Sequence, residues 1–227
     1  MDNKILVLAS GGMDSTVLLY KAVKQVGAAN VYALNMYYGQ RHSKEAFCFA
    51  WQIEHLGIEN WRTLDVKQIY DSDVNCTLLK GNGSIPHGTY EEQKEKDGRV
   101  STYVPFRNGL FLAIACSIAE QYGYQQVWYG AHMDDQAGDA YPDCSDEFIE
   151  NMADAMYFGT ETGIMLHASW RFMDKAGIAI EAKKLGITQD EIAHTWSCYE
   201  GGEKPCGKCA TCLDRAQALK EAGYENC

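Results

Sequence analysis

Apolar residues in the first two thirds of the chain form short runs that alternate with helical stripes. The short runs, which are rich in β-forming residues, predict strands at 4–9, 30–38, 61–66 and 125–131. Apolar residues at helical spacing predict helices at 15–27, 43–57, 107–123 and 145–159. Strands that alternate with crossover helices predict an α/β fold, an open parallel sheet with helices on both faces.

Two polar stretches interrupt this alternation. Residues 70–106 contain few apolar side chains, and a loop of that length in a compact domain is either a lid or disordered. Residues 132–144 form an acidic loop directly after a predicted strand. Ligands of open parallel sheets bind beyond the carboxyl ends of the strands, so both stretches are expected to border one site. Residues 161–227 are expected to form a small α-rich C-terminal segment beside a core at 1–160, the two making one compact unit.

Composition narrows the class of protein. The chain has 227 residues, of which 46% are hydrophobic, and this suffices for one substantial core. The 31 acidic residues outnumber the 20 Lys and Arg residues, and the net charge of -11 disfavours a broad surface for nucleic acid. The first apolar run is too short for a secretion signal or a membrane span. We therefore expect a cytoplasmic protein that binds neither nucleic acid nor membrane.

The loop between the first predicted strand and helix, SGGMDS at 10–15, has the composition of a phosphate cradle. Gly11 and Gly12 let the backbone approach an anion at the positive end of the helix dipole. Hydroxyl donors are added by Ser10, Ser15 and Thr16. Asp14 would repel phosphates unless Mg²⁺ lies between them. The alternative is an ordinary glycine-rich turn in which Asp14 or Ser15 caps the helix.

Four of the nine cysteines crowd into fifteen positions with the spacing C-x7-C-x2-C-x2-C: Cys198, Cys206, Cys209 and Cys212. In a cytosolic chain such a cluster indicates metal binding rather than disulfides. Four thiolates can surround one ion and leave no open position, which favours a structural zinc knuckle. An iron–sulfur site and free thiols are the alternatives. Removal of the metal is expected to unfold this segment, which lacks a core of its own.

The stretch SGGMDS, with its flanking strand and helix, resembles the S-G-G-x-D-S signature of the N-type ATP pyrophosphatases. The resemblance implies an adenine nucleotide alpha hydrolase-like fold that uses ATP and Mg²⁺. It also implies that a substrate oxygen attacks the α-phosphorus and that pyrophosphate leaves. The residues that it implies for ATP binding are Leu8, Ser10, Gly11, Gly12, Asp14, Ser15, Thr16 and Leu18.

Four further stretches resemble the 7-cyano-7-deazaguanine synthases of queuosine precursor biosynthesis: YYGQRHSKE at 37–45, STYVPFRN at 101–108, DAYPDCSDEFI at 139–149 and TWSCYEGGEKPCGKCATCLDRA at 195–216. The resemblance implies an ATP-dependent ligase that converts 7-carboxy-7-deazaguanine and free ammonia to the nitrile. The acid would be adenylated and aminated, and the amide would then be adenylated on its oxygen and lose AMP. The chain departs from the family at Phe106, where glycine is usual, at Asp214, and along 167–178, although Lys175 and Ile178 match.

Four residues are the candidates for catalysis in this interpretation: Asp14, His42, Arg107 and Lys175. Arg107 would pair a carboxylate or phosphates, with a surface salt bridge as the alternative. His42 would assist proton transfer from ammonium or have no chemical role. Lys175 would stabilise charge on phosphate or lie solvated on its helix. His132, which also follows a predicted strand, is interpreted as a loop histidine rather than a ligand.

The expected substrate-binding residues are Tyr38, Gln40, Arg41, Tyr103, Asn108, Asp139, Tyr141 and Asp143. The rings of Tyr38 and Tyr103 would stack on the purine-like base or simply pack in the protein. Asp139 and Asp143 would accept hydrogen bonds from the ring N–H and amine groups, with helix capping as the alternative for Asp143. A homodimer is usual in the family that the chain resembles.

Three rival hypotheses remain open at this stage. A tRNA-modifying ATP pyrophosphatase would carry a basic surface or an RNA-binding domain, and this acidic chain offers neither. A non-catalytic nucleotide-binding or zinc-stabilised protein would lack Asp14 or the substrate-loop residues, and all of them are present. A family variant that stops at the amide, or accepts another nitrogen nucleophile, is the third.

Overall fold

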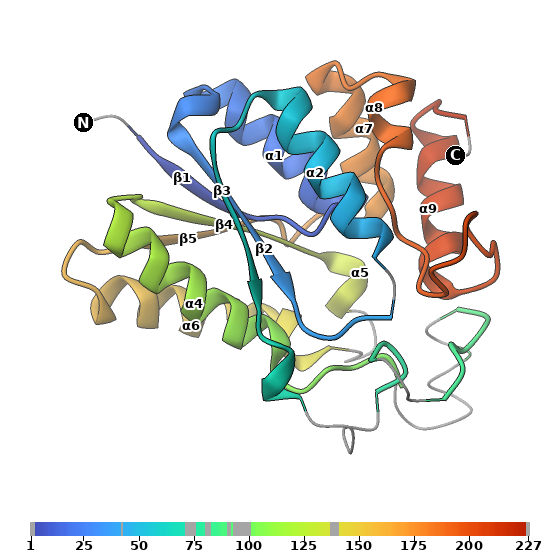
Figure 1. Cartoon of the computed structure of the whole chain (residues 1–227), viewed down its shortest axis with the longest axis horizontal. Helices are drawn as coiled ribbons and strands as arrows, with labels where there is room; N and C mark the ends of the chain where they lie inside the picture. The colour runs from blue at the N-terminus through green and yellow to red at the C-terminus, as the bar shows by residue number, and fades with distance from the viewer. Residues whose placement is uncertain are drawn as a thin grey trace.

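Parallel strands form the central sheet of the computed structural model, which describes residues 3–41, 43–70, 76–79, 83–89, 92, 101–136 and 141–225. The strands are β1 (Ile5–Leu8), β2 (Val31–Tyr37), β3 (Asn60–Asp65), β4 (Gln126–His132) and β5 (Met165–Trp170). Their order is β3-β2-β1-β4-β5, and every neighbouring pair is parallel (Figure 1). The chain proceeds outward from β1 to β3 and then returns to place β4 on the other side of β1. Open parallel sheets bind ligands at such a reversal of strand order.

Helices cover both faces of this sheet, as the alternating pattern predicts (Figure 1). The helices are α1 (Met13–Val26), α2 (Lys44–Leu56), α4 (Arg107–Tyr122), α5 (Met133–Gln136), α6 (Asp146–Gly159), α7 (Lys175–Leu185), α8 (Gln189–Ala193) and α9 (Ala210–Glu221). One face carries α1 and α2 with the C-terminal helices α7, α8 and α9, and the other carries α4 and α6. Within the described ranges, none of the helices combines the length and the apolar character needed to cross a membrane.

The two faces of the sheet make two separate cores, and β1 contributes to both. Ile5 and Val7 pack in the cluster under α1, whereas Leu6 packs with Leu112 of α4 on the opposite face. All three side chains are fully buried. A strand covered on both faces shows a continuous apolar run rather than alternation, which is the pattern read at 4–9. The expected open parallel sheet is therefore confirmed.

Strand β5 was not expected, because residues 161–227 were predicted to be helical apart from the knuckle. The strand pairs in parallel with β4 from Met165 to Trp170 and places this segment in the same sheet as residues 1–160. It is an edge strand whose side chains are mostly exposed or half-buried, with only Trp170 fully buried. Such a strand has neither a long apolar run nor a clean alternation, so hydrophobic patterning did not reveal it.

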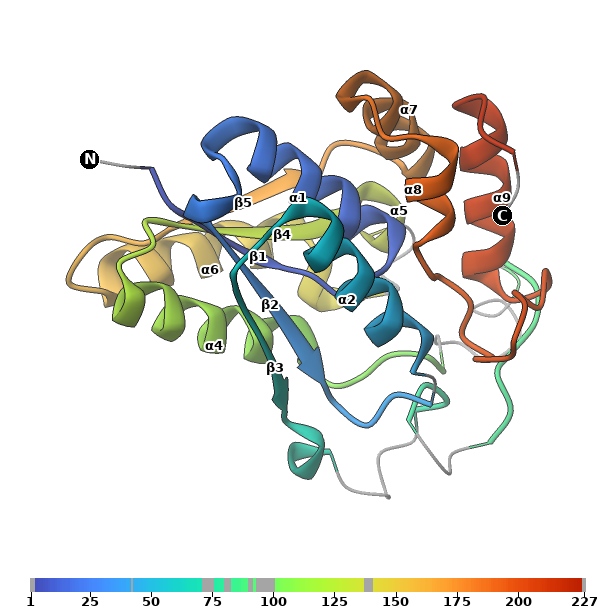
Figure 2. The same ribbon diagram turned by 45° about the horizontal axis from the view of Figure 1, so that its top comes forward.

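The described parts of the 70–106 loop pack against the cysteine-rich segment. Cys76, Leu78, Leu79, Ile85 and Val104 form one buried cluster with Trp196 and the knuckle cysteines. Two contacts extend this junction: the Gly88 amide donates to the Lys208 carbonyl at 3.0 Å, and a His87 ring nitrogen lies 3.1 Å from a Glu200 carboxylate oxygen. Figure 2 shows this loop beside the end of the chain that carries α9.

Candidate active site

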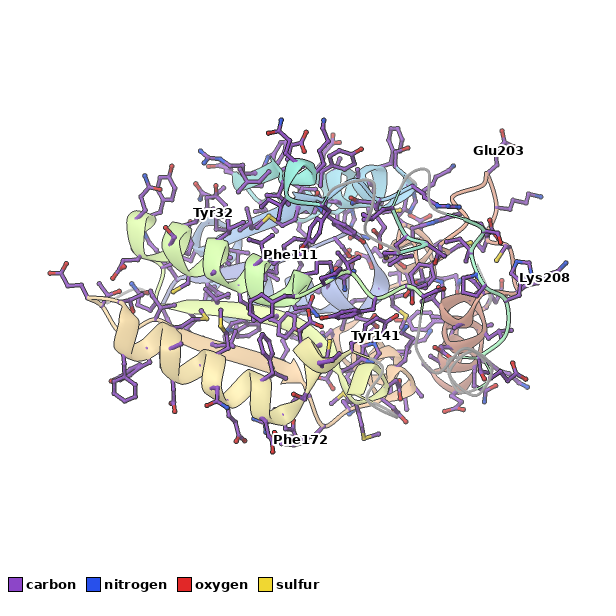
Figure 3. All side chains as sticks on the ribbon, turned by 90° about the horizontal axis from the view of Figure 1, so that it is seen from below. Tyr32, Phe111, Tyr141, Phe172, Glu203 and Lys208 are labelled. Atoms are coloured by element: carbon purple, nitrogen blue, oxygen red, sulfur yellow. The ribbon has the colours of Figure 1, made fainter. Side chains whose placement is uncertain are left out.

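A cavity of about 250 Å³ lies beyond the carboxyl ends of β1, β2 and β4. Leu8, Met36 and His132, from the ends of these three strands, all line it. Other lining residues come from α1, α2, α4, α7 and the segment before α9. In Figure 3 the lining residues Phe111 and Tyr141 lie toward the middle of the view, whereas Glu203 and Lys208 mark the outer edge of the knuckle. The cavity thus occupies the position that the strand order predicts.

The nucleotide loop, residues 10–15, is shaped by glycine and by its own hydroxyl groups. Gly11 has φ +95°, and a Cβ there would lie 2.1 Å from the Glu45 carbonyl oxygen, so only glycine fits. Ser10 Oγ accepts from the Gly12 amide at 3.0 Å, and Ser15 Oγ accepts from the Ser10 amide at 3.1 Å. Gly12 is the N-cap of α1 and brings no side chain to the first N–H groups of the helix. The start of α1 can therefore receive an anion.

Charged side chains from three elements meet beside this loop. Asp14 Oδ2, in the first turn of α1, lies 3.9 Å from Lys175 Nζ and 3.7 Å from His132 Nε2. The Lys175 amide donates to Asp134 Oδ2 at 2.8 Å, which fixes the start of α7. Asp14 Oδ1 is buried and has no hydrogen-bond partner among the described residues. A buried carboxylate oxygen without a protein donor suits a divalent cation such as Mg²⁺.

Arg107 and Tyr38 form a second group of lining residues in the same cavity. Arg107 Nη1 donates to the Tyr38 hydroxyl at 3.4 Å, and the guanidinium carbon lies 5.4 Å from the centroid of the Tyr38 ring. Asn108, the next residue of α4, is held by Asp143, whose Oδ2 accepts from the Asn108 amide at 2.8 Å. The hydroxyl groups of Tyr141 and Thr102 share a hydrogen bond, with their oxygen atoms 2.7 Å apart. A planar cation held beside an aromatic ring can pair with a carboxylate or a phosphate.

Glu45 is a lining residue that the sequence reasoning did not select. It lies in the first turn of α2, and its Oε1 is 3.6 Å from where a Cβ on Gly12 would lie. The pKa of Glu45 is raised to about 7, mainly by burial; Arg107 acts in the opposite direction, and the charge of Asp14 contributes to the rise. Glu45 is the last residue of the YYGQRHSKE stretch, and its position within that motif was the signal that could have identified it as a site residue.

The four knuckle cysteines bring their sulfur atoms together. All four Sγ atoms lie within 4.8 Å of one another, and those of Cys206 and Cys212 are 3.9 Å apart. The amides of Cys206 and Cys209 donate to Sγ atoms of the group at 3.3 Å. None of the eight cysteines that the structure describes forms a disulfide. Four convergent sulfurs supported by N–H donors fit one tetrahedral metal ion.

The knuckle also supplies a wall of the cavity. Trp196, Ser197, Tyr199 and Thr211 line it. The Trp196 amide donates to the Gly11 carbonyl at 3.0 Å, and Thr211 Oγ1 donates to the Ser197 carbonyl at 2.7 Å. The cysteine-rich segment is therefore hydrogen-bonded directly to the nucleotide loop.

Comparison with known proteins shows the family of this chain. The family model described as queuosine biosynthesis protein QueC matches residues 4–223. The chain belongs to this family. A relative from Porphyromonas gingivalis named 7-cyano-7-deazaguanine synthase is 40% identical over 221 residues, which cover 96% of this chain and 93% of the relative. A relative of the same name from Archaeoglobus fulgidus is 35% identical, and the match covers 98% of this chain and 88% of the relative.

Among solved structures, the QueC-family chain is similar to the NMN synthetase from Francisella tularensis. The TM-score is 0.50 with 14% sequence identity, and the match covers 99% of this chain and 79% of that one. At that identity the likeness concerns the fold alone. The expected family and the adenine nucleotide alpha hydrolase-like fold are both confirmed.

Most of the predicted site residues of this QueC-family chain line the cavity beyond β1, β2 and β4. The lining residues that were predicted are Leu8, Ser10, Gly12, Asp14, Ser15, Tyr38, Gln40, Arg107, Asn108, Tyr141 and Lys175. His42 and Asp139 lie outside the described residues. His132 also lines the cavity, in contrast to its interpretation as a loop histidine. Its position directly at the end of a strand was the signal for that placement.

Six predicted residues lie behind the lining rather than in it. Gly11 contacts α2 through its backbone, and Thr16 and Leu18 are fully buried because α1 is covered on more than one side. The Arg41 guanidinium bonds to the carbonyls of Leu79 and Gly83, and the Tyr103 hydroxyl accepts from the Phe106 amide. Asp143 caps the start of α4, so the capping alternative applies, although to a different helix from its own.

Proposed function

We propose that this chain catalyses the ATP-dependent conversion of 7-carboxy-7-deazaguanine and ammonia to 7-cyano-7-deazaguanine. The single observation that carries the proposal is that one cavity is lined by both the nucleotide loop and the pair of Arg107 and Tyr38. This layout supports the proposal because a helix start that can bind phosphate and a cation that can bind a carboxylate share one enclosure. We call the nucleotide loop the phosphate end of the cavity, and Arg107 with Tyr38 its substrate end. The names of the relatives supply the chemical identity of the product.

The nucleotide loop would bind the pyrophosphate part of ATP. The N–H groups at the start of α1 and the hydroxyls of Ser10 and Ser15 would donate to phosphate oxygens. Asp14 would hold Mg²⁺, which neutralises phosphate charge when bound. Lys175, whose side chain is 8% exposed and whose Nζ lies 3.9 Å from Asp14 Oδ2, would stabilise the negative charge that develops at the α-phosphate.

Arg107 would orient the substrate carboxylate, and the rings around it would bind the deazapurine. Tyr38 and Tyr141 offer aromatic surface, and the Gln40 amide oxygen, which accepts from the Tyr38 amide at 2.9 Å, holds this turn in place. A substrate oxygen aimed at the α-phosphorus from this end would form the acyl adenylate as pyrophosphate leaves toward the nucleotide loop. Near-attack positioning of this kind supplies a large part of the rate enhancement.

The four-cysteine group would hold a structural zinc ion. Because all four ligands are protein sulfurs, the ion would have no open position for substrate. Its role would be to keep Trp196, Ser197 and Thr211 in place as a wall of the cavity. We further propose a homodimer in the cytoplasm whose substrates are small molecules rather than nucleic acid, in keeping with the net charge of -11.

The test is a reaction of the purified protein with 7-carboxy-7-deazaguanine, MgATP and ammonium. We expect AMP and pyrophosphate, with the nitrile identified by mass spectrometry. Formation of ADP instead of AMP would contradict attack at the α-phosphorus. Accumulation of the amide would favour the family variant that stops after the first amination. In that case Phe106, the N-cap of α4, would be the first departure from the family to test by mutation.

A further inference from the structure

The proposed reaction removes every proton from the nitrogen that it incorporates. Ammonia is mostly ammonium at neutral pH, with four protons on nitrogen, and the nitrile nitrogen has none. The nucleophilic form is neutral ammonia, so ammonium that enters the cavity has to give up a proton before the first C–N bond forms, and a base in the cavity would accept it. The site described so far assigns no residue to this task, because His42 lies outside the described residues.

The lining offers two carboxylates within the described part of the chain, Asp14 and Glu45. Asp14 lies between Lys175 and His132, and we have assigned it to the phosphates. The Glu45 carboxyl has neither an ion-pair partner nor a hydrogen-bond donor among the described residues. Its surroundings are Asp14 from α1, Arg107 from α4, Tyr38 at the end of β2, and Lys44 and Cys48 on its own helix.

The position of Glu45 matches the place where the nucleophile is needed. Its backbone carbonyl contacts Gly11, and its carboxyl reaches over Gly12, so α2 holds it against the nucleotide loop. Arg107, proposed to orient the substrate carboxylate, acts electrostatically on the same carboxyl. Glu45 therefore lies between the phosphate end and the substrate end, where the adenylated carbon would be.

A second observation concerns charge. A half-buried carboxylate beside bound phosphates is unfavourable unless a cation or a proton neutralises it. Ammonium supplies the cation when it binds, and it supplies the proton when it gives one to the carboxylate. Burial raises the pKa of Glu45 to about 7, which lets it accept a proton near neutral pH and release it again to solvent.

We propose that Glu45 is the general base that deprotonates the nitrogen nucleophile, an inference that rests on the proposed function. Ammonium gives one proton to the Glu45 carboxylate, and its N–H electron pair becomes the lone pair of ammonia. That lone pair attacks the acyl carbon, the C–N bond forms, and the C–O bond to AMP breaks with its electron pair leaving on AMP. The extra proton on the new amide nitrogen passes to solvent or to the departing phosphate.

The experiment separates adenylation from amination in Glu45→Gln, which keeps the size of the side chain and removes the base. Adenylation is measured as exchange between pyrophosphate and ATP that depends on 7-carboxy-7-deazaguanine. Amination is measured with ammonium and, separately, with hydroxylamine, which is mostly unprotonated at neutral pH and needs no initial deprotonation. The matched control is Glu54→Gln, an exposed position on the same helix.

We expect E45Q to keep the exchange activity and to lose about 10²-fold or more in kcat/KM for ammonium, the usual contribution of a general base. Its kcat/KM for hydroxylamine should fall far less, and Glu45→Asp should recover part of the ammonium rate. Equal losses for both nucleophiles, or full ammonium activity in E45Q, would overturn the role of Glu45. Loss of exchange in E45Q would overturn it as well, because it would assign Glu45 to substrate binding or folding.

The same assay distinguishes a failure of the proposed function. If the unmodified chain shows no exchange with 7-carboxy-7-deazaguanine, the substrate assignment fails. If it shows exchange and E45Q aminates normally with ammonium, the function stands and only the inference about Glu45 is wrong.

Discussion

At the phosphate end of the cavity, the hydroxyl groups of Ser10 and Ser15 make their hydrogen bonds within the nucleotide loop, to residues at most five positions apart. At the substrate end, two contacts join residues 35 and 69 positions apart, Asn108 with Asp143 and Arg107 with Tyr38. A locally closed loop keeps its shape with few outside contacts. A site assembled from distant segments depends on the packing of each of them.

Among the described residues, three hydrogen bonds connect the nucleotide loop to distant segments. Asn35 Nδ2 donates to the Ser10 carbonyl at 3.3 Å, the Trp170 indole N–H donates to the Asp14 carbonyl at 3.1 Å, and the Trp196 amide donates to the Gly11 carbonyl. Trp196 lies two residues before the first knuckle cysteine, and its indole N–H donates to the Cys198 carbonyl at 2.8 Å. The local character of the nucleotide loop is thus incomplete. The experiments below test how far the two ends differ.

Removal of the proposed zinc ion should have the largest effect. A structural zinc site contributes on the order of 10 kcal/mol to the fold of its segment. We expect chelator-treated protein to be cleaved by protease within residues 196–212 and to bind ATP several-fold more weakly, because the Trp196 contact to Gly11 is lost. Limited proteolysis and calorimetric ATP titration measure the two effects. Unchanged ATP affinity after loss of the metal would show that the nucleotide loop is self-contained.

Replacement of Asp14→Asn should abolish adenylation with little effect on folding. The carboxylate is the group proposed to hold Mg²⁺ at the phosphates, and its loss is expected to slow pyrophosphate exchange by about 10³-fold. The metal content and the melting temperature should stay the same, since the side chain makes no hydrogen bond that holds the nucleotide loop together. Loss of bound zinc in D14N would indicate a structural role for Asp14 instead.

Replacement of Asp143→Ala tests the long-range contacts of the substrate end. The Asn108 amide would lose its charged acceptor inside the protein, which should lower the free energy of unfolding by about 2 kcal/mol. The displaced start of α4 should also raise the KM for the acid more than the KM for ATP. Urea unfolding and steady-state kinetics measure these changes. Asp154→Ala, an exposed position on α6, is the control and should leave both unchanged.

The pH dependence of stability should report the buried charge of Glu45. Its pKa in the folded chain is raised to about 7 from the ordinary value of 4.5, so the folded state binds the proton more tightly than the unfolded state. Stability should therefore fall as pH rises between these two values, and the loss should be complete above pH 7. We expect E45Q to gain about 1–3 kcal/mol relative to the unmodified chain between pH 5 and pH 8, measured by urea unfolding. A difference that stays constant with pH would contradict a raised pKa.

The smallest effect is expected at Phe106, the N-cap of α4, which has the left-handed backbone conformation with φ 49°. Comparison of Phe106→Gly with Phe106→Ala isolates the backbone strain, because both remove the ring that packs against Gly109 and Phe148. Glycine should be the more stable of the two by about 1 kcal/mol, since alanine keeps the strained φ. Thermal unfolding measures the difference, and equal stabilities would mean that the backbone relaxes in both variants.

Much of the fold was predictable because its signals are local. The apolar runs at 4–9 and 30–38 lie on the central strands β1 and β2, which are covered on both faces and therefore show unbroken patterning. Strand β5 carries exposed and half-buried residues at the sheet edge, so its sequence resembles that of a loop. Helix ends were predicted to within about two residues, since serine caps and closing glycines act on their own helix.

The amino-acid sequence by itself determined that strands β1 to β4 and helices α1, α2, α4 and α6 form, where the glycine-rich turn lies, and that four cysteines are close enough to share one metal ion. These properties depend on residues a few positions apart, where periodicity and turn chemistry operate. Only the tertiary structure decided that Glu45 faces the nucleotide loop and that His132 lies beside Asp14. It also decided that Asp143 caps helix α4, whose first residue, Arg107, lies 36 positions earlier in the chain. Such neighbours follow from the order of strands in the sheet, and the pKa of a carboxyl group follows from the burial and charges that this order creates.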